Sequence, residues 1–205
     1  MNALLIAMSR PRRARRLGCR AGASVIEMAL ILPLLLTIIF GALTAGLLLD
    51  RVLTVLQVVR YAGSMYARGT DFNNAANKNL LLKGAGGLGI TAIGGTGVIY
   101  LSTVVRSIDS SGNPGPLVVS ERFVIGNSTA TFPASRIGTL ARTLNGPVPN
   151  YNTNPLALAP SLQAGFGSIG VNERVFAVEI CDNLTDLGGY LGLMSMSQFY
   201  TRAFF

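Results

Sequence analysis

The hydrophobic pattern begins with one long uncharged run. From Met28 to Leu49 the chain has 22 residues without a charged side chain. An α-helix rises 1.5 Å per residue, so this run would be about 33 Å long, enough to cross a bilayer core of roughly 30 Å. A buried core helix is the alternative, but so long an uncharged run is unusual in a chain of 205 residues. We therefore expect a membrane-spanning helix.

The pattern then becomes amphipathic. After the uncharged run, apolar positions recur at spacings of three and four, as on one face of a helix. They are Leu49, Val52, Leu56, Val59, Gly63 and Tyr66. We predict one continuous helix from about Ser24 to Arg68, its first half in lipid and its second half outside. The amphipathic half packs on the chain's own sheet or on a partner helix, and the pattern alone leaves both open.

Turns and loops come after this helix. Residues 71–79 are polar and rich in asparagine, and we expect a loop there. Residues 84–97 are rich in glycine and contain a formal G-x-G-x-x-G at Gly84, Gly86 and Gly89. A dinucleotide site needs a strand before this motif and a helix after it, and the sequence predicts neither. Glycine turns are the better interpretation.

The rest of the chain predicts β-structure. Four strand-like stretches lie at 98–106, 117–125, 173–181 and 199–205. The first two flank turn residues and predict a β-hairpin. A Pro/Gly/Asn-rich connection comes next at 126–170, with a short helix expected near Ser135–Leu144. The predicted fold is α+β: a long N-terminal transmembrane and amphipathic helix packed on a small antiparallel β-sheet.

Charge is concentrated at the N-terminus. The first 22 residues hold six arginines and no acidic residue, whereas residues 23–205 hold 11 Lys/Arg and 9 Asp/Glu. Cations flanking a membrane helix favour the cytoplasmic side, so we expect a cytoplasmic N-terminus and an extracytoplasmic domain. Because the basic residues set topology, nucleic-acid binding is disfavoured.

Composition gives little support for catalysis. The chain has no histidine, which removes Ser-His-Asp catalysis and the commonest metal ligand. Asp182 and Asp186 are a weak cation signal and are expected to be solvated turn residues. Cys181 is expected to be a buried free thiol, with an intermolecular disulfide as the alternative. We therefore expect that the protein is not an enzyme and that it has no cofactor and no metal site.

The N-terminal segment differs from an ordinary secretory signal. Its apolar run is too long, and its small residues precede the run instead of coming after it. A basic leader ends at Gly22, and Glu27 is the fifth residue after that glycine, at the head of the apolar helix. Pro33 lies six residues further on, where it removes a backbone hydrogen bond and is expected to kink or loosen the helix.

The stretch from Gly22 through Pro33, GASVIEMALILP, resembles a type IV prepilin signal and is similar to the TadE/TadF-like minor pseudopilins of tight-adherence (Flp-type, type IVb) pilus systems. The resemblance implies a cut by a prepilin peptidase between Gly22 and Ala23. It also implies that Glu27 meets the new N-terminal amine of a neighbouring subunit. Major Flp pilins are far shorter and usually carry an aromatic residue where Met28 stands, which favours a minor pilin.

The resemblance implies a location and partners as well. The location is the bacterial inner membrane as a single-pass protein, or the pilus itself. The partners are a prepilin peptidase, other pilins and the inner-membrane assembly platform with its ATPase. The predicted organisation is a leader at 1–22, a transmembrane helix at 23–49, its amphipathic extension at 50–70 and an extracytoplasmic β-rich domain at 71–205. The alternative function is an uncleaved single-pass protein displaying a binding or adhesion domain.

Overall fold

A computed structural model describes residues 18–92, 94–129, 133–183 and 198–205. The chain forms two compact units, residues 1–48 and residues 49–205. The helix α1, Gly18–Ala67, contributes to both. The second unit contains α2 (Ala75–Gly84), β1 (Gly97–Ile108), β2 (Pro114–Gly126), β3 (Gly146–Pro147), the 3₁₀ turn η1 (Pro155–Ala157), α3 (Pro160–Phe166), β4 (Arg174–Asn183) and β5 (Gln198–Phe204). The α+β fold class is therefore confirmed.

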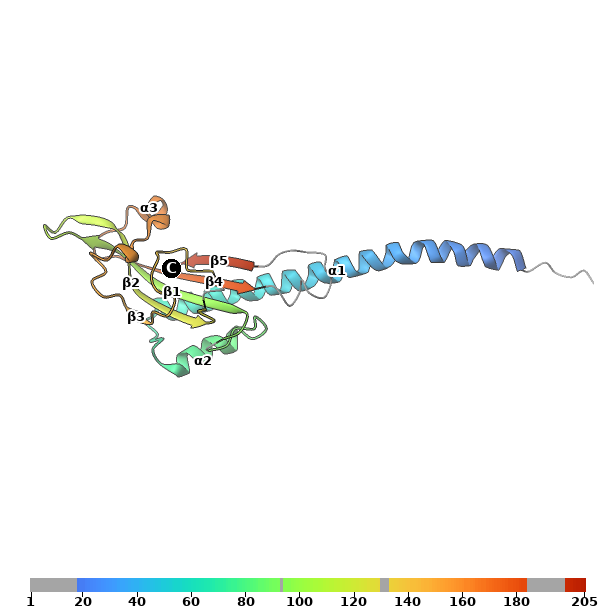
Figure 1. Cartoon of the computed structure of the whole chain (residues 1–205), viewed down its shortest axis with the longest axis horizontal. Helices are drawn as coiled ribbons and strands as arrows, with labels where there is room; N and C mark the ends of the chain where they lie inside the picture. The colour runs from blue at the N-terminus through green and yellow to red at the C-terminus, as the bar shows by residue number, and fades with distance from the viewer. Residues whose placement is uncertain (1–17, 93, 130–132, 184–197) are drawn as a thin grey trace, which may run out of the picture. The chain divides into compact units, whose positions relative to one another are not determined.

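The sheet is antiparallel, with the strand order β3-β2-β1-β4-β5 (Figure 1). The predicted hairpin is β1 with β2, in which Val98 stands opposite Gly126. All four predicted strands are present, and the two-residue β3 is added at one edge. It pairs with Glu121 and Arg122 of β2, and an element of two residues is too short to leave a periodic pattern in the sequence.

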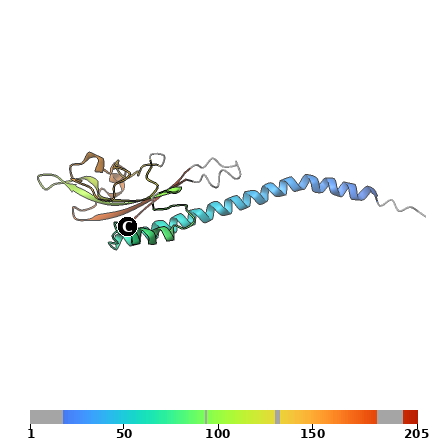
Figure 2. The same cartoon turned by 60° about the horizontal axis from the view of Figure 1, so that its bottom comes forward.

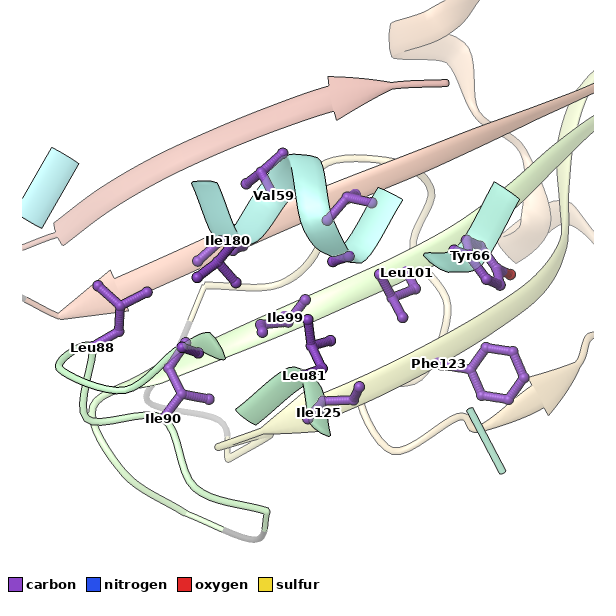
Figure 3. Close-up of a cluster of buried hydrophobic side chains, with 14 of the residues drawn as sticks. Val59, Tyr66, Leu81, Leu88, Ile90, Ile99, Leu101, Phe123, Ile125 and Ile180 are labelled. Atoms are coloured by element: carbon purple, nitrogen blue, oxygen red, sulfur yellow. The ribbon is translucent and has the colours of Figure 1, made fainter. Parts of the chain in front are cut away.

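One face of the sheet packs on the second half of α1 and on α2 (Figure 2). The buried helix positions are Val55, Val58, Val59, Ala62 and Tyr66. They recur at spacings of three and four, as predicted, but the stripe is rotated. Leu49 and Leu56, which we expected inside it, are 61% and 39% exposed. Figure 3 shows Val59 and Tyr66 beside Ile99, Leu101 and Ile180 of the central strands.

The opposite face of the sheet is also covered. The connection between β2 and β4 packs there through Ile137, Leu140, Val148, Ala157 and Leu162. Burial on both faces explains why β1 and β2 contain consecutive apolar residues, as at 98–101 and 117–119, instead of a strict alternation of apolar and polar ones. The long connection is therefore a second layer of the domain.

One loop prediction and one helix prediction were wrong. The asparagine-rich stretch at 71–79 enters α2, because the Asn74 side chain accepts a hydrogen bond from the Ala76 amide and caps the helix. Leu81 is completely buried and packs α2 against the core. Residues 135–144 are not helical: Gly138 has φ +74°, and the helix of this connection is α3, which starts at Pro160.

The glycine-rich stretch at 84–97 forms turns, as predicted. Gly87, Gly89 and Gly95 have positive φ, and Ile90 forms a single bridge to Gly95. At Gly95 a Cβ atom would lie 2.0 Å from the carbonyl oxygen of Gly89, so this turn requires glycine. Ile90 itself is buried in the core, which gives the turn a packing role.

Candidate functional site

The sequence-predicted site residues lie on the first part of α1. This helix begins at Gly18, earlier than the expected Ser24, so it includes Gly22 and Ala23. Glu27 is exposed in the single chain, and the helix continues through Pro33 without a break. Because Ala23 and Glu27 are four residues apart, they lie one turn apart on the same face. The processing and assembly roles of these residues stay predictions.

Apart from Glu27, the exposed surface of α1 from Val25 to Leu49 is largely apolar. Among the described residues, one helix is long and apolar enough to cross a membrane, Val25–Ala67, and its most apolar window has no buried residue in the single chain. The two threonines in the lipid-type run direct their hydroxyls to the backbone: Thr37 donates to the Leu34 carbonyl at 2.7 Å and Thr44 to the Phe40 carbonyl at 2.6 Å. These bonds satisfy hydroxyls that would otherwise be costly to place in lipid. The chain therefore has the features of a membrane-anchored single-pass protein.

One region of this helix has small side chains on its surface. An added Cβ atom at Gly41 or at Gly46 would meet no neighbour within 4 Å. With Ala42 and Ala45 beside them, they form small-xxx-small pairs of the kind that permit close helix approach in lipid. This arrangement can accommodate another helix at close range.

The domain contains a polar site that sequence reasoning missed. Glu179 of β4 is completely buried. Its carboxylate accepts hydrogen bonds from the backbone N–H of Arg136 at 2.9 Å, from the Ser135 hydroxyl and from the Tyr200 hydroxyl of β5. The Arg136 guanidinium also lies 4.1 Å from the centroid of the Tyr200 ring. One carboxylate thus joins β4 to the covering connection and to β5.

A buried cation accompanies it. Arg122 of β2 is 1% exposed, donates through Nε to the Ser102 hydroxyl at 3.1 Å and binds the Ile137 carbonyl through Nη2. Burial lowers the pKa of Arg122, and the negative charge of Glu179 opposes that shift. The negative charge of Glu179 therefore partly compensates the buried positive charge of Arg122. Both residues lie within strand-like stretches, whose sequence identifies the strands but does not distinguish a buried ion from a solvated one.

Cys181 is a free, buried thiol, as predicted. Burial, reinforced by the charge of Glu179, raises the pKa of this thiol to about 12. The neighbouring Asp182 was predicted to be a solvated turn residue, and this was wrong: it is 1% exposed and pairs with Arg51. Asp186 lies outside the described residues. Among the described residues, no group of three or more His, Cys, Asp or Glu is placed to hold a metal ion.

Comparison with known proteins supports the resemblance at the N-terminal end. Residues 22–64 match the family model of TadE-like proteins. The match begins at Gly22 and ends inside the part of α1 that packs on the sheet. No curated protein and no solved structure matches the chain.

Proposed function

We propose that this TadE-like chain is a minor pseudopilin, inserted with its N-terminus in the cytoplasm, cut after Gly22 by a prepilin peptidase and used to assemble or initiate a tight-adherence pilus. The observation that carries the proposal is the position of the family match. It starts at Gly22, where the basic leader ends, and it includes Glu27 and the apolar run. TadE-like proteins are pilus-related, and their role is generally structural.

The proposed mechanism uses the first turns of α1. A cut after Gly22 makes Ala23 the N-terminal residue, whose amine is then charged. Glu27 is costly to bury in an apolar helix bundle unless a cation compensates it. The amine of Ala23 on a neighbouring subunit provides that cation, so the pair sets the axial register between helices. The exposed apolar surface of α1 then moves from lipid to contacts with like helices.

The domain is carried by the same helix. The segment of α1 from Val55 to Tyr66 is the central element of the core beneath the sheet. A subunit drawn into an assembly by its apolar segment therefore brings its folded domain with it. Other pilins, the inner-membrane assembly platform and its ATPase are the partners that this mechanism requires.

The test is the intact mass and N-terminal sequence of the protein purified from bacterial membranes, with and without the host's prepilin peptidase. We expect an N-terminus at Ala23 only when the peptidase is present. Gly22→Val should abolish the cut, whereas Gly18→Val, four residues earlier, should leave it unchanged. A chain that begins at Met1 in both strains would refute processing. The favoured function would then be an uncleaved anchor that displays a binding or adhesion domain.

A further inference from the structure

We propose that the outer edge of β5, the edge that faces away from β4, binds an extended segment of another protein as an added strand, with an acidic residue of that segment opposite Arg202. β5 is the last strand in the order β3-β2-β1-β4-β5, so among the described residues its outer edge has no neighbouring strand (Figure 1). Backbone groups along such an edge can pair with a strand of a partner chain. The proposal concerns the folded domain and does not rest on cleavage at Gly22.

The register of β5 on β4 decides which backbone groups face outward. The Phe205 amide donates to the Phe176 carbonyl at 2.9 Å, and the Phe176 amide donates to the Phe205 carbonyl at 3.0 Å. In an antiparallel ladder, pairs that exchange both hydrogen bonds alternate with pairs that exchange none. The pairing continues along β5 without a register shift. The N–H and C=O groups that point away from β4 are therefore those of Tyr200, Arg202 and Phe204.

These outward groups are unpaired but held in place. Within the described part of the chain, the backbone groups of the three residues make no hydrogen bond. The Tyr200 hydroxyl donates to the buried carboxylate of Glu179, and the ring centroid of Phe204 lies 4.8 Å from that of Phe166. Because its side chains are already fixed, β5 loses little conformational entropy when a strand is added.

The opposite edge of the sheet, on β2, is covered. The Leu117 amide donates to Gln163 Oε1 at 3.1 Å, and the Leu117 carbonyl accepts a bond from the Ala159 amide at 2.9 Å. Further along β2, the Val124 amide donates to Asn145 Oδ1 at 2.9 Å, and β3 pairs between these two points. The connection between β2 and β4 thus closes the β2 edge to an added strand. Among the described residues, no segment does this for β5.

The charge of β5 indicates the kind of segment that fits. Arg202 is exposed and is the only charged residue of β5. Its guanidinium lies 5.6 Å from the centroid of the Phe204 ring and, within the described residues, makes no hydrogen bond or ion pair. Its cross-strand neighbour Glu179 already accepts bonds from Ser135, Arg136 and Tyr200. An acidic residue directly opposite Arg202 on the added strand would complete a favourable cross-strand pair.

This charge favours another protein over a second copy of the chain. β5 contains no acidic residue, so two β5 strands paired with each other would leave both Arg202 side chains without a counter-charge. The β2 edge of a second copy is covered by its own connection and cannot accept β5. The partner we propose therefore supplies an extended segment in which an acidic residue lies between two apolar or β-branched residues on the same face, opposite Tyr200 and Phe204.

The experiment titrates the full chain in detergent micelles with the peptide STVTETVTS and measures amide hydrogen exchange by NMR. The central glutamate of the peptide is placed opposite Arg202, and the palindromic sequence allows either strand direction. We expect slower exchange of the outward amides of Tyr200, Arg202 and Phe204. The amides of Thr201 and Ala203 face β4 and should exchange as before.

The peptides STVTQTVTS and STVTKTVTS test the role of charge. The wild type should bind the glutamate peptide about two- to fivefold more tightly than the glutamine peptide, and the lysine peptide more weakly still. Arg202→Gln should remove this preference without changing the circular dichroism. Arg60→Gln removes an exposed arginine of α1 outside β5 and is the matched control; it should keep the preference.

Three results would overturn the proposal. Unchanged exchange of the outward β5 amides at millimolar glutamate peptide would show that this edge does not accept a strand. Equal affinity for the glutamate and lysine peptides would show that the added strand need not be acidic. An Arg202→Gln variant that keeps the wild-type preference would show that Arg202 does not select the partner.

Discussion

Arg51 of α1 donates a hydrogen bond through Nε to Asp182 Oδ2 of β4 at 2.8 Å, across 131 residues of sequence. The side chain of Arg51 is 14% exposed and that of Asp182 is fully buried. The ion pair therefore joins the helix, just past its lipid-type run, to the end of a central strand. In the sequence, Arg51 is one of only two cations that closely follow that run, and its partner could not be inferred.

Replacing Arg51 with alanine should destabilise the domain. The change leaves a buried carboxylate without its guanidinium, which typically costs about 3–5 kcal/mol. Urea denaturation of the full chain in micelles measures the free energy of unfolding. Arg60→Ala, an exposed arginine on the same helix, should change it by less than about 0.5 kcal/mol. Equal effects of the two changes would mean that the pair contributes nothing to stability.

Glu179→Gln should loosen the attachment of β5 and of the covering connection. Glutamine replaces one of the two accepting oxygens by an amide nitrogen that cannot accept: it loses either the bond from Ser135 or the bonds from Arg136 and Tyr200. The charge of Arg122 also loses its complement. We expect a loss of about 3 kcal/mol in the free energy of unfolding, with faster amide hydrogen exchange in β5.

Glu173→Gln is the control for that change, because Glu173 is exposed. It should alter stability by less than about 0.5 kcal/mol and leave exchange in β5 unchanged. If Glu179→Gln unfolds at the same urea concentration as the wild type, the buried network has no role in stability.

Stability should fall as the pH rises above about 9. Burial raises the pKa of Cys181 from 9.0 to about 12, and it also raises the pKa values of Tyr66, Tyr100 and Tyr200 above 10.0. The folded chain therefore keeps protons that the unfolded chain releases. Because the unfolded state binds fewer protons there, the free energy of unfolding decreases with pH.

Denaturation at a series of pH values from 7 to about 11 measures this slope. Cys181→Ser removes the thiol contribution and should flatten the curve from about pH 9 upward, while the tyrosine contribution remains. A wild-type curve that is flat across this range would contradict the raised pKa values.

Glu27→Ala should abolish pili while leaving the protein in the membrane. Glu27→Gln, which keeps the size and removes the charge, should have the same effect if the carboxylate pairs with the amine of Ala23. Asp50→Ala is the matched control, since Asp50 is an exposed acid on the same helix. Electron microscopy counts the pili, and immunoblots of membrane fractions report insertion. Normal piliation of the Glu27 variants would refute the register role.

Local patterns along the chain were enough to predict the long helix, the four main strands and the α+β class. An uncharged run of membrane length and continuous apolar strands each need only neighbouring residues to be recognised. The segment from Gly22 through Glu27 to Pro33 was identified for the same reason, because that signal is contiguous. The family match to residues 22–64 confirms the resemblance there.

The tertiary structure alone decided which polar residues are buried and which contacts they make. Asp182 was expected in solvent but pairs with Arg51. Glu179 is buried and accepts hydrogen bonds from the Ser135 and Tyr200 hydroxyls. Such contacts join residues that are distant in the chain, so no local pattern encodes them. The same reason applies to α2, where burial of Leu81 and one asparagine cap outweigh a locally loop-like composition.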